Sequence, residues 1–167
     1  MAAGATYEPI ATTTLASAAN AITFSSIPAT YTDLVVVFNA SCSTGGTTGQ
    51  MLLNNATTGY SATFLRGTGS AAASNRFTSD SSLTVMYQAL SSTVPSHARI
   101  NIFNYTGSTY KTVLIEDAQD YNGSGQVMRS VGLYQSTSAI TSIKLQASGG
   151  ANLDIGTTAT LYGIKAA

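Results

Sequence analysis

Apolar positions along the chain recur every second residue or in short runs, the two patterns typical of β-strands. Polar and apolar residues alternate in Arg99–Ile102, which predicts a strand with one face in solvent. Leu34–Phe38 is apolar at every position and predicts a central strand covered on both faces. Gly, Ser and Thr interrupt every candidate helix. We therefore predict strands at Ala21–Phe24, Asp33–Ala40, Gln50–Asn54, Tyr60–Arg66, Ser82–Gln88, Ala98–Tyr105, Tyr110–Glu116, Gln126–Tyr134, Ile140–Gln146 and Thr158–Ile164.

Short strands at fairly even spacing predict an all-β fold, an antiparallel, jelly-roll-like β-sandwich of about eight to ten strands. We expect residues 11–167 to form one domain and residues 1–10, which precede any clear strand, to form an extended N-terminal arm. Ser43–Gly49 and Gly67–Asn75 have the length and composition of surface loops. Tyr105–Tyr110 is expected to be a short hairpin turn in which Gly107 supplies the unusual backbone angle.

Charged residues are scarce. They make up 8% of the 167 residues, against roughly a quarter in typical soluble domains. The seven basic and seven acidic residues cancel, which argues against nucleic-acid binding through phosphates. A surface of Ser, Thr, Ala and Gly loses little side-chain entropy when it is immobilised, and a net charge of zero protects poorly against association. The composition favours a surface that packs against neighbours in an assembly.

The single cysteine, Cys42, excludes an intrachain disulfide. We interpret it as a small, half-buried side chain near a strand end rather than a nucleophile. The opening MAAGATYEPI has neither the basic nor the apolar region of a signal peptide. No apolar run reaches the length of a membrane span. We expect synthesis in a cytoplasm without signal-directed export, and no membrane partner.

The one histidine, His97, is a candidate for the base of a Ser–His–Asp triad. Serines are abundant, but no G-x-S-x-G elbow occurs. A histidine in a loop or at the start of a strand is the favoured interpretation.

Glu116, Asp117 and Asp120 form the one acidic cluster, where a predicted strand runs into a loop. Calcium prefers such oxygen ligands, but the spacing does not match an EF-hand, and no Cys/His set for zinc exists. The same residues are candidates for the paired carboxylates of a glycosidase, although nothing specifies their separation. A solvated loop is favoured, and we assign no catalytic, cofactor or metal-ligating residue.

Neither the glycines nor the tyrosines define a site. Gly67-Thr68-Gly69 lacks the later glycine of a dinucleotide fingerprint, and there is no P-loop lysine. Nine tyrosines, with Asn and Ser, are compatible with a glycan-binding surface. Their simpler role is to fill sheet edges and contacts between subunits.

Two parts of the chain are distinctive as strings. The first is ATYEPIATTTL (residues 5–15) with ITFSSIPATYTDL (residues 22–34), and the second is VGLYQSTSAITSI (residues 131–143) with TATLYGIK (residues 158–165). They resemble small structural proteins of tailed bacteriophages, especially of marine and cyanobacterial hosts. The resemblance spans nearly the whole chain and implies a β-sandwich virion component. It carries no site residue, because these are strand and turn segments.

Three hypotheses follow for function. The first is a capsid decoration (cement) protein of the virion. It would form a homo-oligomer, expected to be a trimer, and bind the major capsid protein on the outer shell. The second is a tail or fibre component that binds host surface glycan. The third is a glycan depolymerase that uses Glu116, Asp117 and Asp120.

Overall fold

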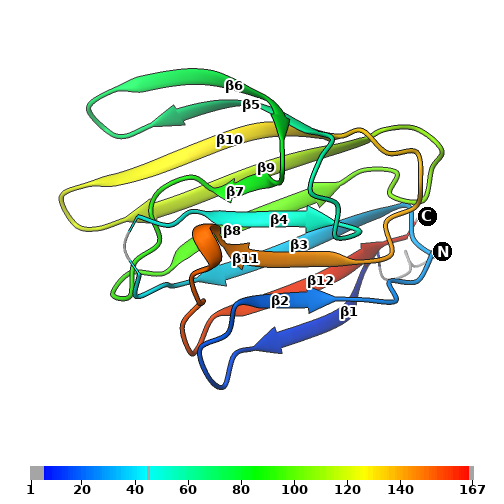
Figure 1. Cartoon of the computed structure of the whole chain (residues 1–167), viewed down its shortest axis with the longest axis horizontal. Helices are drawn as coiled ribbons and strands as arrows, with labels where there is room; N and C mark the ends of the chain where they lie inside the picture. Colours follow the sequence, from blue (N-terminus) through cyan, green and yellow to red (C-terminus); the bar gives the residue numbers. More distant parts are fainter. Residues whose placement is uncertain (1–5, 45, 166–167) are drawn as a thin grey trace.

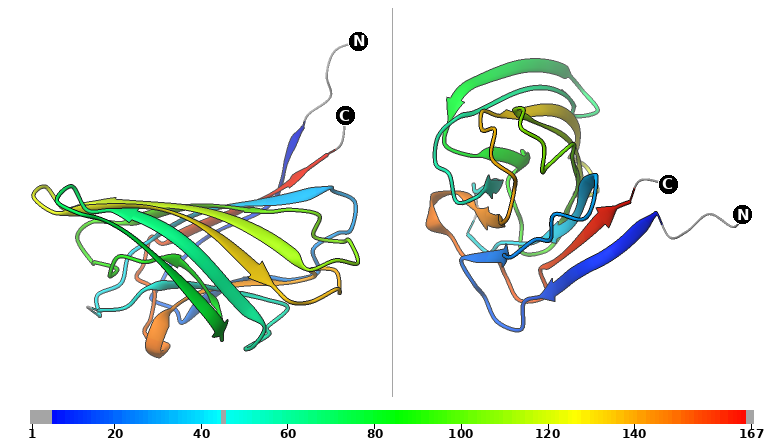
Figure 2. Two further views of the ribbon diagram at one scale, coloured as in Figure 1. Left: turned by 90° about the horizontal axis from the view of Figure 1, so that it is seen from above. Right: turned by 90° about the vertical axis from the view of Figure 1, so that its right-hand side faces the viewer.

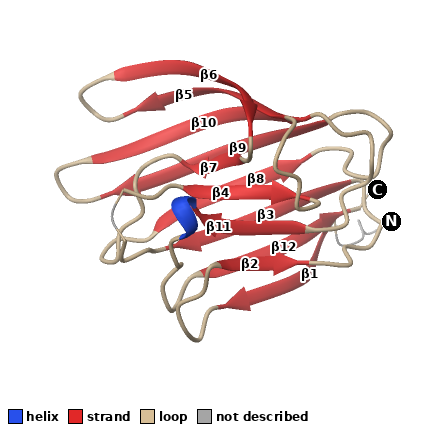
Figure 3. Cartoon of the chain, in the orientation of Figure 1, coloured by secondary structure: helices blue, strands red, loops and turns tan. Residues whose placement is uncertain are grey.

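The computed structural model describes residues 6–44 and 46–165, which form a sandwich of an eight-stranded and a four-stranded antiparallel sheet (Figure 1). Figure 3 shows one helical turn, Ser148–Gly150, beside these strands. No described segment is a helix long and apolar enough to cross a membrane. The larger sheet runs, in spatial order, β1 (Tyr7–Thr14), β12 (Thr158–Ile164), β3 (Asp33–Ala40), β8 (Ser96–Ile102), β9 (Lys111–Asp120), β10 (Gly125–Tyr134), β5 (Tyr60–Gly67) and β6 (Ala72–Asp80). The smaller sheet runs β2 (Ala21–Phe24), β11 (Ile143–Ala147), β4 (Gly49–Leu53) and β7 (Leu83–Met86).

The expected jelly roll is present, and it is enlarged by two hairpins. Strands β1-β12-β3-β8 face strands β2-β11-β4-β7, and the chain passes between the two sheets as in a jelly roll. Hairpin β5–β6 is inserted between β4 and β7, and hairpin β9–β10 between β8 and β11. Because β10 pairs with β5, and β9 pairs with β8, the two hairpins lengthen the larger sheet. We call strands β9, β10, β5 and β6 the extension.

The hydrophobic core lies between the sheets and follows from the alternation of the strands. In β8, Ile100 and Ile102 are fully buried while Arg99 is exposed, as predicted. Strand β3 is central, with Phe38 fully buried against the smaller sheet and Val35 covered on the other face. Burying a side chain such as Phe38 contributes about 1.5–3 kcal/mol. Because these side chains pack against the smaller sheet, the opposite face of the larger sheet is the outer face of the sandwich.

Two strands were missed, so the count is twelve instead of eight to ten. The expected loop Gly67–Asn75 is wrong, because Ala72–Asp80 forms β6 and the hairpin closes at Thr68 N–H to Ala71 O (2.9 Å). Small residues such as Ala, Ser and Asn carry little strand propensity, so the pattern gave no signal. The expected acidic loop is also a strand, since β9 continues to Asp120.

Most of the expected N-terminal arm is either strand or outside the described residues. Residues 1–5 fall outside them, whereas Tyr7–Ile10 form the first half of β1 and lie alongside β12. Thr-rich sequence without an apolar run concealed this strand. Figure 2 shows that the described ends of the chain lie side by side, and the Lys165 N–H donates to the Thr6 carbonyl (3.0 Å).

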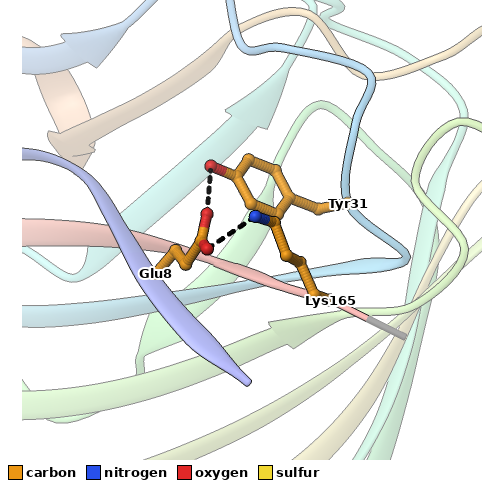
Figure 4. Close-up of polar contacts among 3 residues, drawn as sticks. All are labelled: Glu8, Tyr31 and Lys165. Carbon is orange, nitrogen blue, oxygen red and sulfur yellow. Dashed lines mark hydrogen bonds and ion pairs between the residues drawn. The ribbon is translucent and has the colours of Figure 1, made fainter. Parts of the chain in front are cut away.

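Glu8 links β1 to two other parts of the fold (Figure 4). Its Oε1 lies 2.6 Å from Lys165 Nζ, and its Oε2 accepts a hydrogen bond from the Tyr31 hydroxyl (3.3 Å). The ammonium of Lys165 lowers the pKa of Glu8, and Glu8 raises the pKa of Lys165. The Tyr31 ring packs on Gly163, where an added Cβ would lie 2.3 Å from Tyr31 Cγ. These contacts fasten the first strand onto the last.

The turn between β8 and β9 differs in detail from expectation. The left-handed residue is Asn104 (φ 48°) rather than Gly107. Gly107 is needed for space, because its Cβ would lie 2.3 Å from the Asn104 amide. Lys111 is fully buried beneath this turn, and its ammonium donates to the carbonyls of Gly107 and Thr109 (2.6 Å for Thr109).

Candidate functional site

The outer face of the extension carries large apolar side chains in solvent. Strand alternation turns Val127 and Val131 of β10 outward, and Leu65 of β5 lies beside them. Leu65 is 65% exposed, Val127 62% and Val131 48%. Exposed apolar residues grouped on one face mark interaction surfaces more often than scattered ones do.

The same face is hollowed into two adjoining depressions. One has a volume of about 820 Å³ and is bordered by Leu65, Ser74 and Val127. The other, of about 560 Å³, lies between the tips of the two hairpins, and Gly67 and Val127 line both. Glycines make up a third of the residues that line the second depression. Gly125 has to be glycine, because a Cβ there would lie 2.8 Å from the Gln119 carbonyl oxygen.

One ion pair crosses this surface. Arg129 of β10 stands opposite both Leu65 and Glu116, and its guanidinium lies 3.4 Å from the Glu116 carboxylate. Both side chains are well exposed (64% and 43%). Such a pair contributes about 0–1 kcal/mol to stability. Its two opposite charges cancel, so this part of the outer face carries no net charge.

The inner face of the extension combines buried apolar side chains, such as Phe64 and Met128, with a group of buried polar ones. Asp117 and Gln119 of β9 point inward and are 7% exposed, and Gln126 and Ser130 of β10 are buried beside them. One side-chain atom of each has no hydrogen-bond partner among the described residues. Buried polar atoms are normally paired, so this cluster has hydrogen-bonding capacity that the fold does not use.

Several of these side chains hold the loop that follows β7. The Asp117 carboxylate accepts from the Tyr87 N–H (2.6 Å), and Gln119 Nε2 donates to the Val94 carbonyl (3.0 Å). The Tyr121 hydroxyl donates to the Ala89 carbonyl (2.6 Å). Burial raises the pKa of Asp117 to about 6, and the hydrogen bond from Tyr87 opposes that rise. The inner face thus anchors the extension to the sandwich.

The acidic cluster does not converge on one point. Glu116 and Asp120 face outward, while Asp117 faces the interior. Glu116 and Asp120 are four positions apart on one strand, about 13 Å along the backbone, which is longer than the carboxylate spacings of roughly 5–9.5 Å that glycosidases use. The residues that the structure describes contain no group of three or more potential metal ligands.

His97 and Cys42 lie where the sequence placed them. His97 is the second residue of β8, exposed, with Nδ1 2.8 Å from the Asn39 side-chain oxygen on the neighbouring strand. The partner in this contact is an amide, not the carboxylate of a triad. Cys42 follows β3 by two residues and is fully buried instead of half-buried.

Most of the tyrosines are buried or half-buried. Tyr60, Tyr105 and Tyr134 are buried, and Tyr60 stacks on Tyr134 with ring centroids 4.9 Å apart. Tyr7 and Tyr110 are the exposed tyrosines of the described chain. Gly67-Thr68-Gly69 lies at the tip of the β5–β6 hairpin, where all three residues line the smaller depression. The tyrosines therefore form no continuous stacking platform for sugars.

The outer residues of the extension were missed by the sequence analysis. In Gln126–Tyr134, apolar residues stand at both odd and even positions, so the sequence did not show which set faces solvent. The polar residues Gln126 and Ser130 share a face with Tyr134 and wrongly suggest that this face lies in solvent. The usable signal was Arg129, which shares the other face with Val127 and Val131, because charged side chains are seldom fully buried.

Comparison of the chain with protein-family models, with curated proteins and with solved structures found no match.

Proposed function

We propose that this chain is a structural protein of a bacteriophage particle, namely a capsid decoration protein that binds the outer shell through the outer face of the extension. The supporting observation is the group of exposed apolar residues, Leu65, Val127 and Val131, on a hollowed and nearly neutral sheet face. The likeness of the terminal segments to small virion proteins of tailed phages gives the proposal its setting. Tail placement with host-glycan binding is the alternative, which the experiments below distinguish.

The mechanism is mass action. A protein that binds the assembled shell, and not free capsid subunits, stabilises the shell by its binding free energy. A symmetric lattice repeats the site, so an oligomer gains avidity when its geometry matches the lattice. The small side chains around the apolar residues, such as Ala72, Ser74 and Ala118, lose little entropy on docking.

The test is binding to empty shells assembled from the major capsid protein of the same phage, measured by co-sedimentation. We expect Val127→Glu to weaken binding at least about 10-fold, because it places an unpaired carboxylate in an apolar contact. Ile155→Glu is the matched control, since Ile155 is 67% exposed but lies in the β11–β12 connection. Equal binding by both variants would show that the outer face of the extension does not bind the shell.

Electron cryomicroscopy of the whole particle tests the location. Density repeated over the shell lattice supports decoration, whereas density confined to the tail supports the alternative. In the second case a glycan array becomes the next measurement, with Tyr7 and Tyr110 as the exposed tyrosines to substitute. Self-association, expected from composition, and the homotrimer, expected for a decoration protein, stay predictions, and light scattering of the free protein measures both.

A further inference from the structure

The four edge strands of the two sheets differ in how readily they could pair with a further strand. β2 and β7, at the edges of the smaller sheet, have only four residues each. β1 contains Pro9 and an irregularity between Pro9 and Ala11, both of which hinder pairing with a further strand. β6 has nine residues and contains no proline. It pairs one-to-one with β5 from Ala72 to Phe77, and its own irregularity lies beyond that stretch, between Phe77 and Asp80. Of the four, β6 is the edge best suited to accept another strand.

The hairpin geometry shows which backbone groups of β6 face outward. The hydrogen bond from Thr68 N–H to Ala71 O closes the hairpin, and antiparallel pairs alternate between bonded and non-bonded beyond such a closure. Ala72, Ser74 and Arg76 therefore direct their N–H and C=O groups to the free edge. The Arg76 N–H agrees with this, because it donates to the side-chain oxygen of Asn75 (2.7 Å) and not to β5.

Charge does not protect this edge. Arg76 is the one charged residue of Ala72–Phe77, and its guanidinium donates to Thr63 Oγ1 on β5 (3.4 Å). The side chain thus lies back over the sheet. Natural edges usually discourage pairing with charged side chains or proline. Ala72–Phe77 contains no proline, and its single charged side chain is directed towards β5 rather than past the free edge.

We propose that β6 pairs antiparallel with β6 of a second copy of this chain, across a two-fold axis at Ser74. In this register Ser74 stands opposite Ser74 of the other copy, and Ala72 stands opposite Arg76. All outward backbone groups of the three residues then meet a partner, and the long Arg76 side chain faces alanine instead of another arginine. A two-fold contact uses the same surface on both copies and closes at two. The proposal does not depend on a role in a phage particle.

The pairing also extends the hollowed surface. Ala72 and Ser74 border the larger depression, so the second copy continues that surface across the axis. Strand pairing without a large apolar contact falls below the roughly 800 Å² per partner of a standard interface. We therefore expect a dimer that dissociates measurably on dilution.

Sedimentation velocity over roughly 1–300 μM protein tests the proposal. We expect the wild type to pass from monomer to dimer, and Ser74→Lys to raise the dissociation constant at least about 10-fold, because two like charges then stand directly opposite. Thr14→Lys is the matched control, which places the same charge at the exposed end of the β1 edge. Asn75→Ala frees the Arg76 N–H and is expected to tighten the dimer.

Hydrogen exchange locates the contact in the same samples. The amides of Ala72 and Ser74 should gain protection with concentration, whereas those of Ala73 and Asn75, which already bond to β5, should not change. A wild type that is monomeric at every concentration, a trimer, or a dimer lost in Thr14→Lys but kept in Ser74→Lys would each overturn the proposal. A folded circular dichroism spectrum for each variant excludes unfolding as the cause.

Discussion

The carboxylate of Asp117, on β9, accepts a 2.6 Å hydrogen bond from the backbone N–H of Tyr87, the residue that follows β7. This contact joins the added extension to the edge of the smaller sheet. Asp117 is 7% exposed, and one of its oxygens has no described partner. The junction between jelly roll and extension therefore rests partly on a buried ionisable group.

This burial makes stability depend on pH. The pKa of Asp117 rises from 3.8 to about 6 in the folded protein, so between these values the folded state binds more protons than the unfolded state. The contribution is fully present below pH 3.8 and is lost as pH rises through 6. At about 1.4 kcal/mol per pH unit, the loss is about 3 kcal/mol. We expect Asp117→Asn, which keeps an oxygen for Tyr87, to be more stable than wild type at pH 8 by up to that amount.

Urea denaturation at pH 4, 6 and 8 measures this difference. The two proteins should have similar stability near pH 4 and diverge as pH rises. Comparing them directly cancels the opposite pH effect of Glu8, whose pKa is lowered. A constant difference at all three pH values would mean that Asp117 does not titrate in this range.

The jelly-roll core was predictable because its strands obey simple alternation. The alternation of Arg99 with Ile100 and Ile102 predicts a strand with one face in solvent. The structure confirms this, because both isoleucines are buried and Arg99 is exposed. β6 was not predictable, because Ala72–Asp80 contains one large apolar residue, Phe77. It is a strand because it pairs with β5, and such pairing is a tertiary effect that the local residue types do not encode.

The candidate site was less predictable than the fold. Leu65 and Val127 look like core residues in sequence, and only the charged Arg129, on the same face of the sheet, indicates that they face solvent. The acidic cluster, in contrast, was conspicuous in sequence, but a strand divides Glu116 and Asp117 between two faces. Successive side chains of a strand point to opposite faces of the sheet, so neighbours in sequence are separated. Residues of different strands that share a face are brought together instead.

Two glycines that support close packing should differ in tolerance. An added Cβ at Gly163 would lie 2.3–2.5 Å from ring atoms of Tyr31, a ring held by its hydrogen bond to Glu8. An added Cβ at Gly132 would lie 2.7 Å from the end of Leu83, a flexible side chain. We expect Gly163→Ala to cost about 1–3 kcal/mol, as overpacking does, and Gly132→Ala clearly less. Thermal denaturation of the two variants measures this ranking, and the reverse order would contradict it.

Lys111 should stabilise the β8–β9 turn. It is fully buried, burial lowers its pKa, and its ammonium bonds the carbonyls of Gly107 and Thr109. Lys111→Met keeps the apolar stem and removes both hydrogen bonds, at an expected cost of about 1–3 kcal/mol. Lys144→Met, at a half-buried position of β11, is the control and should change stability little. Chemical denaturation at pH 7 compares them, and equal stability of the two variants would show that the ammonium contributes nothing.

The contact between Glu8 and Lys165 should control how firmly β1 is held. Because Lys165 lowers the pKa of Glu8, the ion pair is present above the carboxyl's usual pKa of 4.5 and is lost as pH falls through the lowered value. Glu8→Gln keeps a side-chain oxygen for Tyr31 but removes the charge.

We expect β1 amides to exchange several-fold faster in Glu8→Gln at pH 7, with little change in global stability, since exposed ion pairs contribute little. The difference should shrink in 1 M salt, because the Debye length falls to about 3 Å. Glu116→Gln removes the other exposed ion pair, in the middle of the sheet, and should leave β1 exchange unchanged. If both variants accelerate β1 exchange equally, the effect reflects sheet stability as a whole, and the first strand is held by backbone pairing with β12 alone.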